Sequence, residues 1–313
     1  MISIKRIISI FKKDKRNFCY RFVRKLCSGW MPDAIYLKIL YRIFIGKRLN
    51  LSNPQTYNEK LQWLKIHDHN PLYTIMVDKY AVKEYVADKI GEEYIIPTLG
   101  VWDRLEEVDF ESFPNQFVLK TTFGGGGNDL IICKDKRTLD THVAINYLKR
   151  FMKQDSYKHL REWPYKNVPR RIIAEKYMEE PGKPSLTDYK VMCFNGVAKL
   201  IEYHFGRYTD NHTQDFYDRD WNKTTITQGS YGAVSDYNAE RPEKLEEMLK
   251  LSEILAKDIP HVRVDWYLIE NHLYFGELTF FDGSGLTPWD NESDDLLLGS
   301  WITLPAKTKS KNL

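Results

Sequence analysis

One stretch near the end of the chain constrains the fold more than any other. It reads as two strands, Val262 to Ile269 and Leu273 to Phe281, joined by the polar link Glu270-Asn271-His272. Both strands are rich in β-branched and aromatic residues, which favours a β-hairpin. Apolar side chains occupy most positions on both faces, and a strand of that kind belongs in a buried sheet. The sequence therefore predicts a hairpin packed inside the molecule.

The same hairpin carries a pair of carboxylates. If the link is a three-residue loop with Asn271 near the left-handed conformation, Asp265 faces Glu277 and Arg263 faces Thr279. Opposed side chains lie only about 5 Å apart at Cβ. Two carboxylates that close repel unless a cation lies between them, and Mg²⁺ prefers hard oxygen ligands. The pair therefore indicates a site for metal-bound nucleotide, whose phosphate the arginine would neutralise; the alternative is a solvated acidic face.

Composition excludes several other classes of site. With 313 residues the chain can hold two or three domains and a sizeable core. Its four cysteines show no CxxC spacing, which predicts free thiols in a reducing cytoplasm. Neither the Walker nor the Rossmann glycine motif is present, and the histidines lack HExxH spacing. His204 and His261 are interpreted as ordinary polar residues.

Residues 1–48 are strongly basic. Thirteen Lys and Arg stand against two Asp within residues 1–50, and Ile and Phe alternate with the cations at helical spacing. The pattern predicts basic helices that either lie on an anionic membrane surface or pack on the protein's own body. No apolar run approaches the roughly 20 residues of a membrane span. We expect a cytoplasmic protein, with a peripheral position on the inner face of the membrane as the alternative, and no nucleic-acid partner.

Further along, the chain alternates helical and extended segments. Residues 49–112 look mainly helical, with one helix from about 72 to 90. After it, strands are predicted at 117–120, 130–133, 171–178, 189–194 and 198–204, and helices at 140–153 and 242–257. Asn195-Gly196 is the strongest hairpin signal. The tail, residues 306–313, is predicted to be disordered.

A glycine tract follows the first of these strands. The four glycines Gly124, Gly125, Gly126 and Gly127 offer backbone N–H groups without a Cβ to obstruct a phosphate. Such a tract alone is more often a flexible turn. Here Lys120 ends the apolar strand before it, and Lys176 follows another apolar run. A lysine in that position can reach a phosphate while its stem packs on the sheet.

Together these elements resemble the ATP-grasp superfamily, and within it the branch similar to the teichuronopeptide-biosynthesis protein TupA. The resemblance covers about residues 49–305. It rests on segments 51–54, 56–63, 78–80, 96–100, 117–120, 188–190, 195–196, 217–221, 263–265 and 275–279. It implies an α+β fold in which two lobes with antiparallel sheets clasp ATP. The ATP-grasp domain would span 113–305, with lobes at 113–174 and 175–305, after the helical region 49–112.

The resemblance also implies an activity. ATP-grasp enzymes typically phosphorylate a carboxylate with ATP and Mg²⁺, and an amine then attacks the acylphosphate. For this branch the implied substrates are a sugar carboxylate, such as a uronic acid of capsular or cell-wall polysaccharide, and an amino acid or amine.

The implied roles fall on individual residues. Lys79 and Lys120 would hold the ATP phosphates beneath the glycine loop, and Asp188 would contact the ribose. The hinge that reads adenine would comprise Glu175, Lys176, Tyr177 and Met178. Asp265 and Glu277 would bind Mg²⁺, with Arg263 near the reacting phosphate. Two features depart from the family: Thr279 replaces the usual Asn as third metal ligand, and the loop lacks the common His or Ser. Lys190, Arg207 and Arg219 are candidates for the catalytic and acceptor site.

One motif points to another reaction. Asp218-Arg219-Asp220 has the DxD spacing with which many glycosyltransferases bind a metal and a nucleotide-sugar. A metal-dependent glycosyltransferase of polysaccharide biosynthesis is therefore the alternative hypothesis, and a non-catalytic membrane-associated binding protein is the third.

Overall fold

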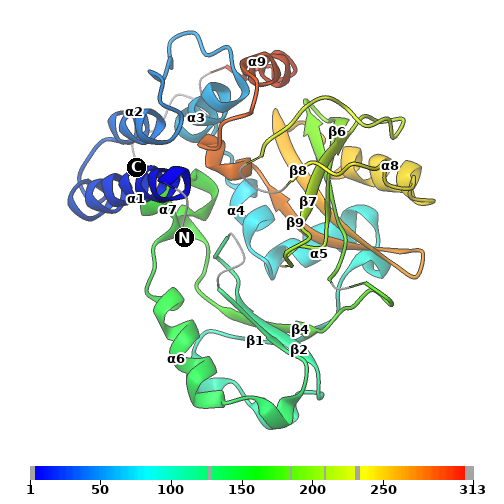
Figure 1. The fold of residues 1–313 in the computed structure, drawn as a ribbon. Helices are drawn as coiled ribbons and strands as arrows, with labels where there is room; N and C mark the ends of the chain where they lie inside the picture. The colour runs from blue at the N-terminus through cyan, green and yellow to red at the C-terminus, as the bar shows by residue number, and fades with distance from the viewer. Residues whose placement is uncertain (1–3, 126–128, 184, 208, 230–232, 307–313) are drawn as a thin grey trace.

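The computed structural model describes residues 4–125, 129–183, 185–207, 209–229 and 233–306 (Figure 1). The fold is α+β, with two antiparallel sheets and helices at the N-terminal end. The small sheet has the order β1-β4-β2-β3 and the large sheet the order β7-β6-β5-β8-β9. Their strands are β1 (Thr98–Trp102), β2 (Phe117–Thr121), β3 (Leu130–Cys133), β4 (Ile172–Lys176), β5 (Asp188–Phe194), β6 (Val197–Phe205), β7 (Thr213–Tyr217), β8 (His261–Ile269) and β9 (His272–Thr279).

Helices surround and link the two sheets. The α-helices are α1 (Ile4–Cys27), α2 (Asp33–Phe44), α3 (Tyr57–His67), α4 (Leu72–Val77), α5 (Ala81–Ile90), α6 (Thr141–Met152), α7 (Ser156–Leu160), α8 (Leu245–Leu255) and α9 (Glu292–Ser300). Short 3₁₀ helices are η1 (Glu92–Tyr94), η2 (Leu105–Glu107), η3 (Phe110–Ser112), η4 (Lys136–Thr138), η5 (Trp163–Asn167) and η6 (Asp282–Gly285). Figure 1 shows α6 beside the small sheet and α8 beside the large one.

The carboxylate hairpin is formed by β8 and β9, and its predicted pairing is confirmed. Asp265 pairs with Glu277 and Arg263 with Thr279. The predicted three-residue loop is wrong, because only Glu270 and Asn271 separate the strands, both with positive φ, as a two-residue type I′ turn requires. A bulge opposite Asp265 and Trp266, where Gly276 is the extra residue, restores the predicted register.

The large sheet separates apolar from charged side chains. On β8, Val262, Val264 and Trp266 are buried, and the Trp266 indole donates to Ser252 of α8 at 2.8 Å. Side chains alternate along a strand, so Arg263 and Asp265 lie on the opposite face. One face of the sheet therefore packs on α8 and the other is lined with charged groups.

The small sheet has its own core, made by Phe113, Phe117, Leu119 and Ile172 with part of α6. The predicted hairpin of β2 and β3 is confirmed, with Phe117 opposite Cys133. The sheet begins earlier than the predicted lobe boundary at residue 113, since β1 pairs with β4. The sequence did not predict β1, because Pro97 and Gly100 interrupt the strand pattern in a segment that looks mainly helical.

The helix predicted over residues 72–90 is broken into α4 and α5. Asp78 ends the first helix, and its carboxylate accepts the backbone N–H groups of Tyr80 and Ala81. It also pairs with Arg171 at 2.6 Å. The N–H of Lys79 donates to the carbonyl of Thr122. The break therefore fastens Lys79 to the small lobe beside the glycine loop.

The predicted basic helices are α1 and α2. Tyr36, Leu37 and Leu40 of α2 are fully buried, and α1 packs against them through Tyr20 and Val23. In the part of the chain that the structure describes, no helix is long and apolar enough to cross a membrane. Apart from residue 306, the predicted disordered tail lies outside the described residues.

Candidate active site

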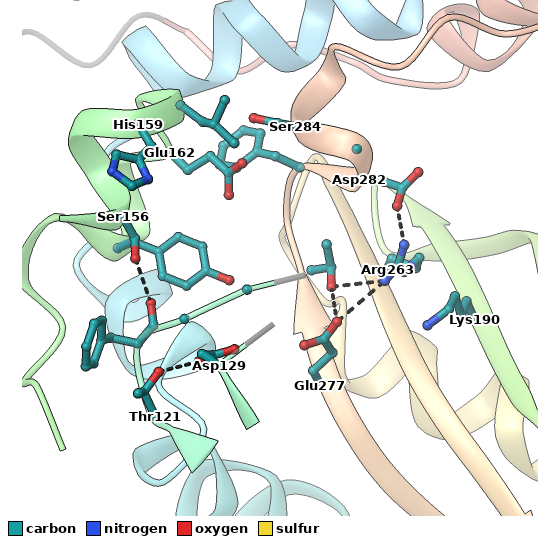
Figure 2. Close-up of a pocket in the computed structure, with 18 of the residues that line it drawn as sticks. Thr121, Asp129, Ser156, His159, Glu162, Lys190, Arg263, Glu277, Asp282 and Ser284 are labelled. Carbon is teal, nitrogen blue, oxygen red and sulfur yellow. Dashed lines mark hydrogen bonds and ion pairs between the residues drawn. The ribbon is translucent and has the colours of Figure 1, made fainter. Parts of the chain in front are cut away.

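A cavity of about 550 Å³ lies between the glycine loop, the segment of α7 and η5, and the charged face of the large sheet (Figure 2). Seven of the predicted site residues line it: Gly124, Gly125, Lys190, Arg207, Arg263, Glu277 and Thr279. Gly126 and Gly127 lie outside the described residues. The cavity therefore brings together residues of β5, β8 and β9 with residues that follow β2 and β6, which are far apart in the sequence.

Arg263 is the centre of the charged face. Its guanidinium binds Asp265 through two hydrogen bonds, Nε–Oδ1 at 2.7 Å and Nη2–Oδ2 at 2.8 Å. It also pairs with Asp282 and lies 3.5 Å from Glu202 and 3.6 Å from Glu277. Burial opposes the charge of Arg263, but Asp265, Asp282 and Glu202 outweigh it and raise the pKa well above its usual value. Several carboxylates therefore hold one fixed cation in a buried position.

A second cation lies beside the first. Lys190 on β5 is buried and pairs with Asp265 at 2.5 Å and Asp188 at 3.5 Å. Arg207 pairs with the other oxygen of Asp188 at 3.1 Å and is one-third exposed. Burial opposes ionisation of Asp188, but Lys190 and Arg207 hold its pKa below the usual value. Asp188 is thus bonded to two cations rather than open to the cavity.

Two histidines and a carboxylate occupy the β6 part of the wall. Nε2 of His204 is 2.6 Å from Glu202, and its Nδ1 is 2.8 Å from Nε2 of His212. Gln214 donates to the same oxygen of Glu202 at 2.6 Å. Burial opposes ionisation of Glu202, but His204 and Arg263 hold its pKa far below the usual value. Glu202 is therefore an anion that fixes His204 at the cavity wall.

The net charge of the charged face would suit a divalent cation. Five carboxylates, those of Asp188, Glu202, Asp265, Glu277 and Asp282, stand against three cations, those of Lys190, Arg207 and Arg263. Burial raises the pKa of Asp282 to about 6 despite its ion pair with Arg263, so this group is mainly ionised at neutral pH. With histidine counted as neutral, the cluster carries an excess of negative charge that a metal ion would balance.

The described residues offer such a metal ion fewer than three protein ligands. Among the described residues, no three acidic, histidine or cysteine side chains are arranged to hold a metal ion. Mg²⁺ commonly uses one or two carboxylates and completes its shell with substrate phosphates and water. Glu277, 43% exposed, is the accessible carboxylate, since Asp265 is bonded to Arg263 and Lys190. Thr279 donates to Glu277 at 3.2 Å, so its hydroxyl is within reach of the same ion.

The glycine loop is held by Thr121 and Asp129, which the sequence did not single out, and by Lys79, which it did. The Thr121 hydroxyl donates to Asp129 across the mouth of the loop, and Lys79 donates to the carbonyl of Gly124 (Figure 2 shows the first contact). The ammonium of Lys79 is also 3.8 Å from Asp129. A Cβ on Gly124 would overlap the Asp129 carboxylate. The glycine is therefore needed for close approach, and Lys79 lies beside it; the predicted contact of Lys79 with ATP phosphates stays a prediction.

Glu175, the first residue of the predicted hinge, forms an ion pair with Lys120. Both oxygens of this buried carboxylate are paired, one with Lys120 at 2.5 Å and the other with Lys83 at 2.7 Å. Lys176 donates its backbone N–H to Pro97, which joins the end of β4 to β1. Lys120, Glu175, Lys176, Tyr177 and Met178 do not line the described cavity. Their predicted contacts with ATP remain predictions.

The DxD triplet lies in a turn after β7. The carboxylate of Asp218 accepts the N–H groups of Asp220 and Asn222 and the side-chain amide of Asn222. Arg219 pairs with Glu253 of α8 and donates to the carbonyl of Ala198. None of the three lines the cavity, so the structure does not bring Arg219 to the predicted acceptor site.

Of the two histidines interpreted as ordinary polar residues, His261 is structural. It is buried between the Tyr57 hydroxyl and the carbonyl of Cys193, and burial lowers its pKa to about 3. His204 instead lines the cavity. Period-two alternation along the predicted strand would have placed Glu202 and His204 on one face, but the sequence interpretation did not use it. Other lining residues carried no such signal, namely Asp129, Glu162, Tyr165, His212, Asp282 and Ser284.

Comparisons with known proteins found one family model and a set of solved structures similar to this chain. A family model described as TupA-like ATPgrasp matches residues 59–303. No curated protein matches the chain. Among solved structures, D-cycloserine synthetase DcsG is 14% identical, with a TM-score of 0.42, over 85% of this chain and 77% of its own. D-alanine–D-alanine ligase from Bacillus anthracis complexed with ATP is 16% identical, with a TM-score of 0.37, over 66% of this chain. The chain spans 54% of the length of that ligase.

Proposed function

Because this chain belongs to the TupA-like ATP-grasp family, we propose that it is an ATP- and Mg²⁺-dependent ligase that joins a carboxylate to an amine through an acylphosphate. The observation that supports it best is the charged face around Arg263, where fixed cations and an excess of carboxylates meet the glycine loop across one cavity. Phosphoryl transfer asks the protein mainly to position the reactants and stabilise charge, and this face is built for both.

Each group at the face has a role in the proposal. Glu277, with Thr279 beside it and Asp265 opposite, would hold Mg²⁺, which would offset the charge of the transferred phosphoryl group. Arg263 is kept in place by Asp265 and Asp282, so it would present a fixed positive charge near the reacting phosphate. Lys79 would bind phosphate oxygens at the glycine loop, where the Gly124 carbonyl already receives its ammonium. Lys120, aligned by Glu175, would hold the nucleotide.

The carboxylate substrate would lie at the cationic end of the cavity. Lys190 and Arg207 line it there, and His204 and His212 offer ring nitrogens for hydrogen bonds beside them. A sugar acid presents one carboxylate and several hydroxyl groups, which suits this mixture. We propose a uronic acid of capsular or cell-wall polysaccharide as the substrate class, with an amino acid or amine as the second substrate.

A position on the inner face of a bacterial membrane is a further part of the proposal. The C-terminal half of α1 packs on the protein through one face. On another face, Phe18, Phe22 and Leu26 form an exposed apolar stripe, and Trp30, which is 72% exposed, continues it. Exposed cations flank it, among them Lys15, Arg16, Arg21 and Lys25. Aromatic side chains bordered by cations favour the interface of an anionic membrane.

The test is ADP release from purified protein with ATP and Mg²⁺ across a panel of uronic acids and amino acids. We expect release that requires one carboxylate and one amine together. Glu277→Gln keeps the side-chain size but removes a charge from the metal pair, so turnover should fall by orders of magnitude while the unfolding midpoint stays near that of the unchanged protein. Near-normal turnover in this variant would remove Glu277 from the site.

A further inference from the structure

One carboxylate of the cavity has no place in the mechanism so far. Glu162 precedes η5 and lines the cavity across from Lys190, with its side chain directed inward near Ser284 (Figure 2). The structure gives Glu162 no ion pair with any described residue within 4 Å. A carboxylate in a partly dehydrated cavity is costly unless a cation or donor meets it. Glu162 therefore calls for a ligand of positive charge.

Ser284 is the side chain that meets Glu162 from the opposite wall. Its φ of 57° lies in the left-handed region, between Gly283 at 50° and Gly285 at 57°. A serine in this conformation is strained, and such strain gathers at functional sites. Gln62 holds the turn by donating to the carbonyls of Ser284 and Gly285 at 3.0 and 2.7 Å. The turn fixes the serine hydroxyl at the cavity wall, close to Glu162.

A buried lysine lies behind that serine. The Nζ of Lys65 donates to Oγ of Ser284 at 2.7 Å, to the Ser284 carbonyl at 2.7 Å and to the Leu160 carbonyl at 3.0 Å. An ammonium has three protons, so all are used. Since Oγ accepts from Lys65, the serine's own proton is left for an acceptor on the cavity side, where Glu162 lies. Lys65, Ser284 and Glu162 therefore follow one another from the interior to the cavity, with a hydrogen bond between the first two.

We propose that Glu162, which lies beside Ser284 and in front of the buried Lys65, binds the ammonium group of the amine substrate and accepts the proton that it must lose. This inference rests on the proposed ligase function. The carboxylate takes one proton from R–NH₃⁺ to give R–NH₂ and a neutral acid. The amine nitrogen then attacks the acyl carbon, the C–N bond forms, and the C–O bond to phosphate breaks. The second nitrogen proton leaves with the phosphate, so atoms and charges balance.

The surroundings suit a proton acceptor. Burial raises the pKa of Glu162, and the charge of Glu277 raises it further, whereas Lys65 and the Ser284 hydroxyl oppose both. Tyr165 lines the same cavity. A base is most effective when its pKa approaches the working pH. Burial lowers the pKa of Lys65 to about 8, closer to neutral pH than that of an ordinary lysine.

Two nucleophiles separate this role from a structural one. Hydroxylamine is uncharged at neutral pH and traps the acylphosphate as a hydroxamate, whereas an amino acid must first lose a proton. Glu162→Gln should lower amide formation from glycine by about 100-fold or more, the scale of general-base catalysis, and raise the KM for glycine. The loss with hydroxylamine should be at least about 10-fold smaller. The glycine rate of the variant should also rise more steeply with pH than that of the unchanged protein.

Each outcome decides a different point. Equal losses with both nucleophiles, or no loss with either, would overturn the role of Glu162 while leaving the ligase function intact. No hydroxamate from the unchanged protein with any uronic acid of the panel would overturn the proposed function and this inference with it. Ser284→Ala should show the same selectivity in weaker form, and it decides the question if Glu162→Gln does not fold. Glu246→Gln, an exposed carboxyl of α8, is the matched control.

Discussion

Glu175→Gln removes the charge that holds two lysines of the small lobe together. In the structure, one oxygen of Glu175 is 2.5 Å from Nζ of Lys120 and the other is 2.7 Å from Nζ of Lys83. All three groups are largely buried. The substitution keeps the shape of the side chain and leaves two ammonium groups facing each other without an anion.

The magnitude follows from this geometry. A unit charge pair about 4 Å apart near a protein surface is worth about 4 kcal/mol before desolvation is subtracted. Removing one partner of a buried pair costs about 3–5 kcal/mol, because the other charge stays buried and unpaired. Glutamine can still accept one hydrogen bond from a lysine, so we expect a loss near the lower end, about 3 kcal/mol of unfolding free energy at neutral pH.

The loss should also depend on pH. Burial opposes ionisation of Glu175, but Lys120 and Lys83 outweigh it and hold its pKa below the usual value. A carboxyl with a lowered folded pKa stabilises the protein above its unfolded pKa and loses that contribution as pH falls through the folded pKa. The difference between the variant and the unchanged protein should therefore be full at neutral pH and shrink in acid.

Urea unfolding at neutral and mildly acidic pH measures both effects. Glu107→Gln, which breaks an exposed pair with Arg104, is the control and should change stability by less than about 1 kcal/mol. Saturating MgATP should recover part of the loss in Glu175→Gln, because the triphosphate would restore negative charge near Lys120. A loss under about 1 kcal/mol at neutral pH would refute the idea that Glu175 holds the two lysines.

Further predictions concern nucleotide and membrane binding. Lys120→Ala should weaken ATP binding in calorimetry, because an ammonium offsets triphosphate charge, whereas Asp218→Ala should leave it almost unchanged; the reverse pattern would favour the glycosyltransferase hypothesis. The full chain should sediment with anionic liposomes at low salt and be released near 1 M salt, where the Debye length shrinks to about 3 Å. Exchanging Phe18, Phe22 and Trp30 for serine should abolish sedimentation, and equal binding to neutral liposomes would contradict the electrostatic part.

The sequence predicted the hairpin pairing correctly from an incorrect loop. The true loop is one residue shorter, and the bulge at Gly276 compensates for it. A bulge is decided by how the strand packs, which composition does not show. The position of Arg263 beside Asp265 and of Glu277 across the hairpin followed from period-two alternation alone. Local pattern was therefore sufficient wherever the site lies on regular strands.

Irregular segments carried no comparable signal. Glu162 lies between α7 and η5, and Ser284 lies in a left-handed turn after β9. Their meeting with Lys65 depends on how three distant segments pack. The DxD spacing of Asp218 was a real pattern, but it serves a turn. Spacing alone does not distinguish a carboxylate that binds metal from one that accepts backbone N–H groups.

The most direct test of the proposed ligase reaction follows the carboxylate oxygens of the substrate rather than the consumption of ATP. A uronic acid labelled with ¹⁸O in its carboxylate is incubated with the protein, ATP, Mg²⁺ and the amine that supports ADP release, and inorganic phosphate is analysed by mass spectrometry. An acylphosphate route transfers one carboxylate oxygen to phosphate, so we predict one ¹⁸O in phosphate for each amide formed. Unlabelled phosphate, with both labelled oxygens retained in the sugar product, would contradict carboxylate activation and with it the account given for this site.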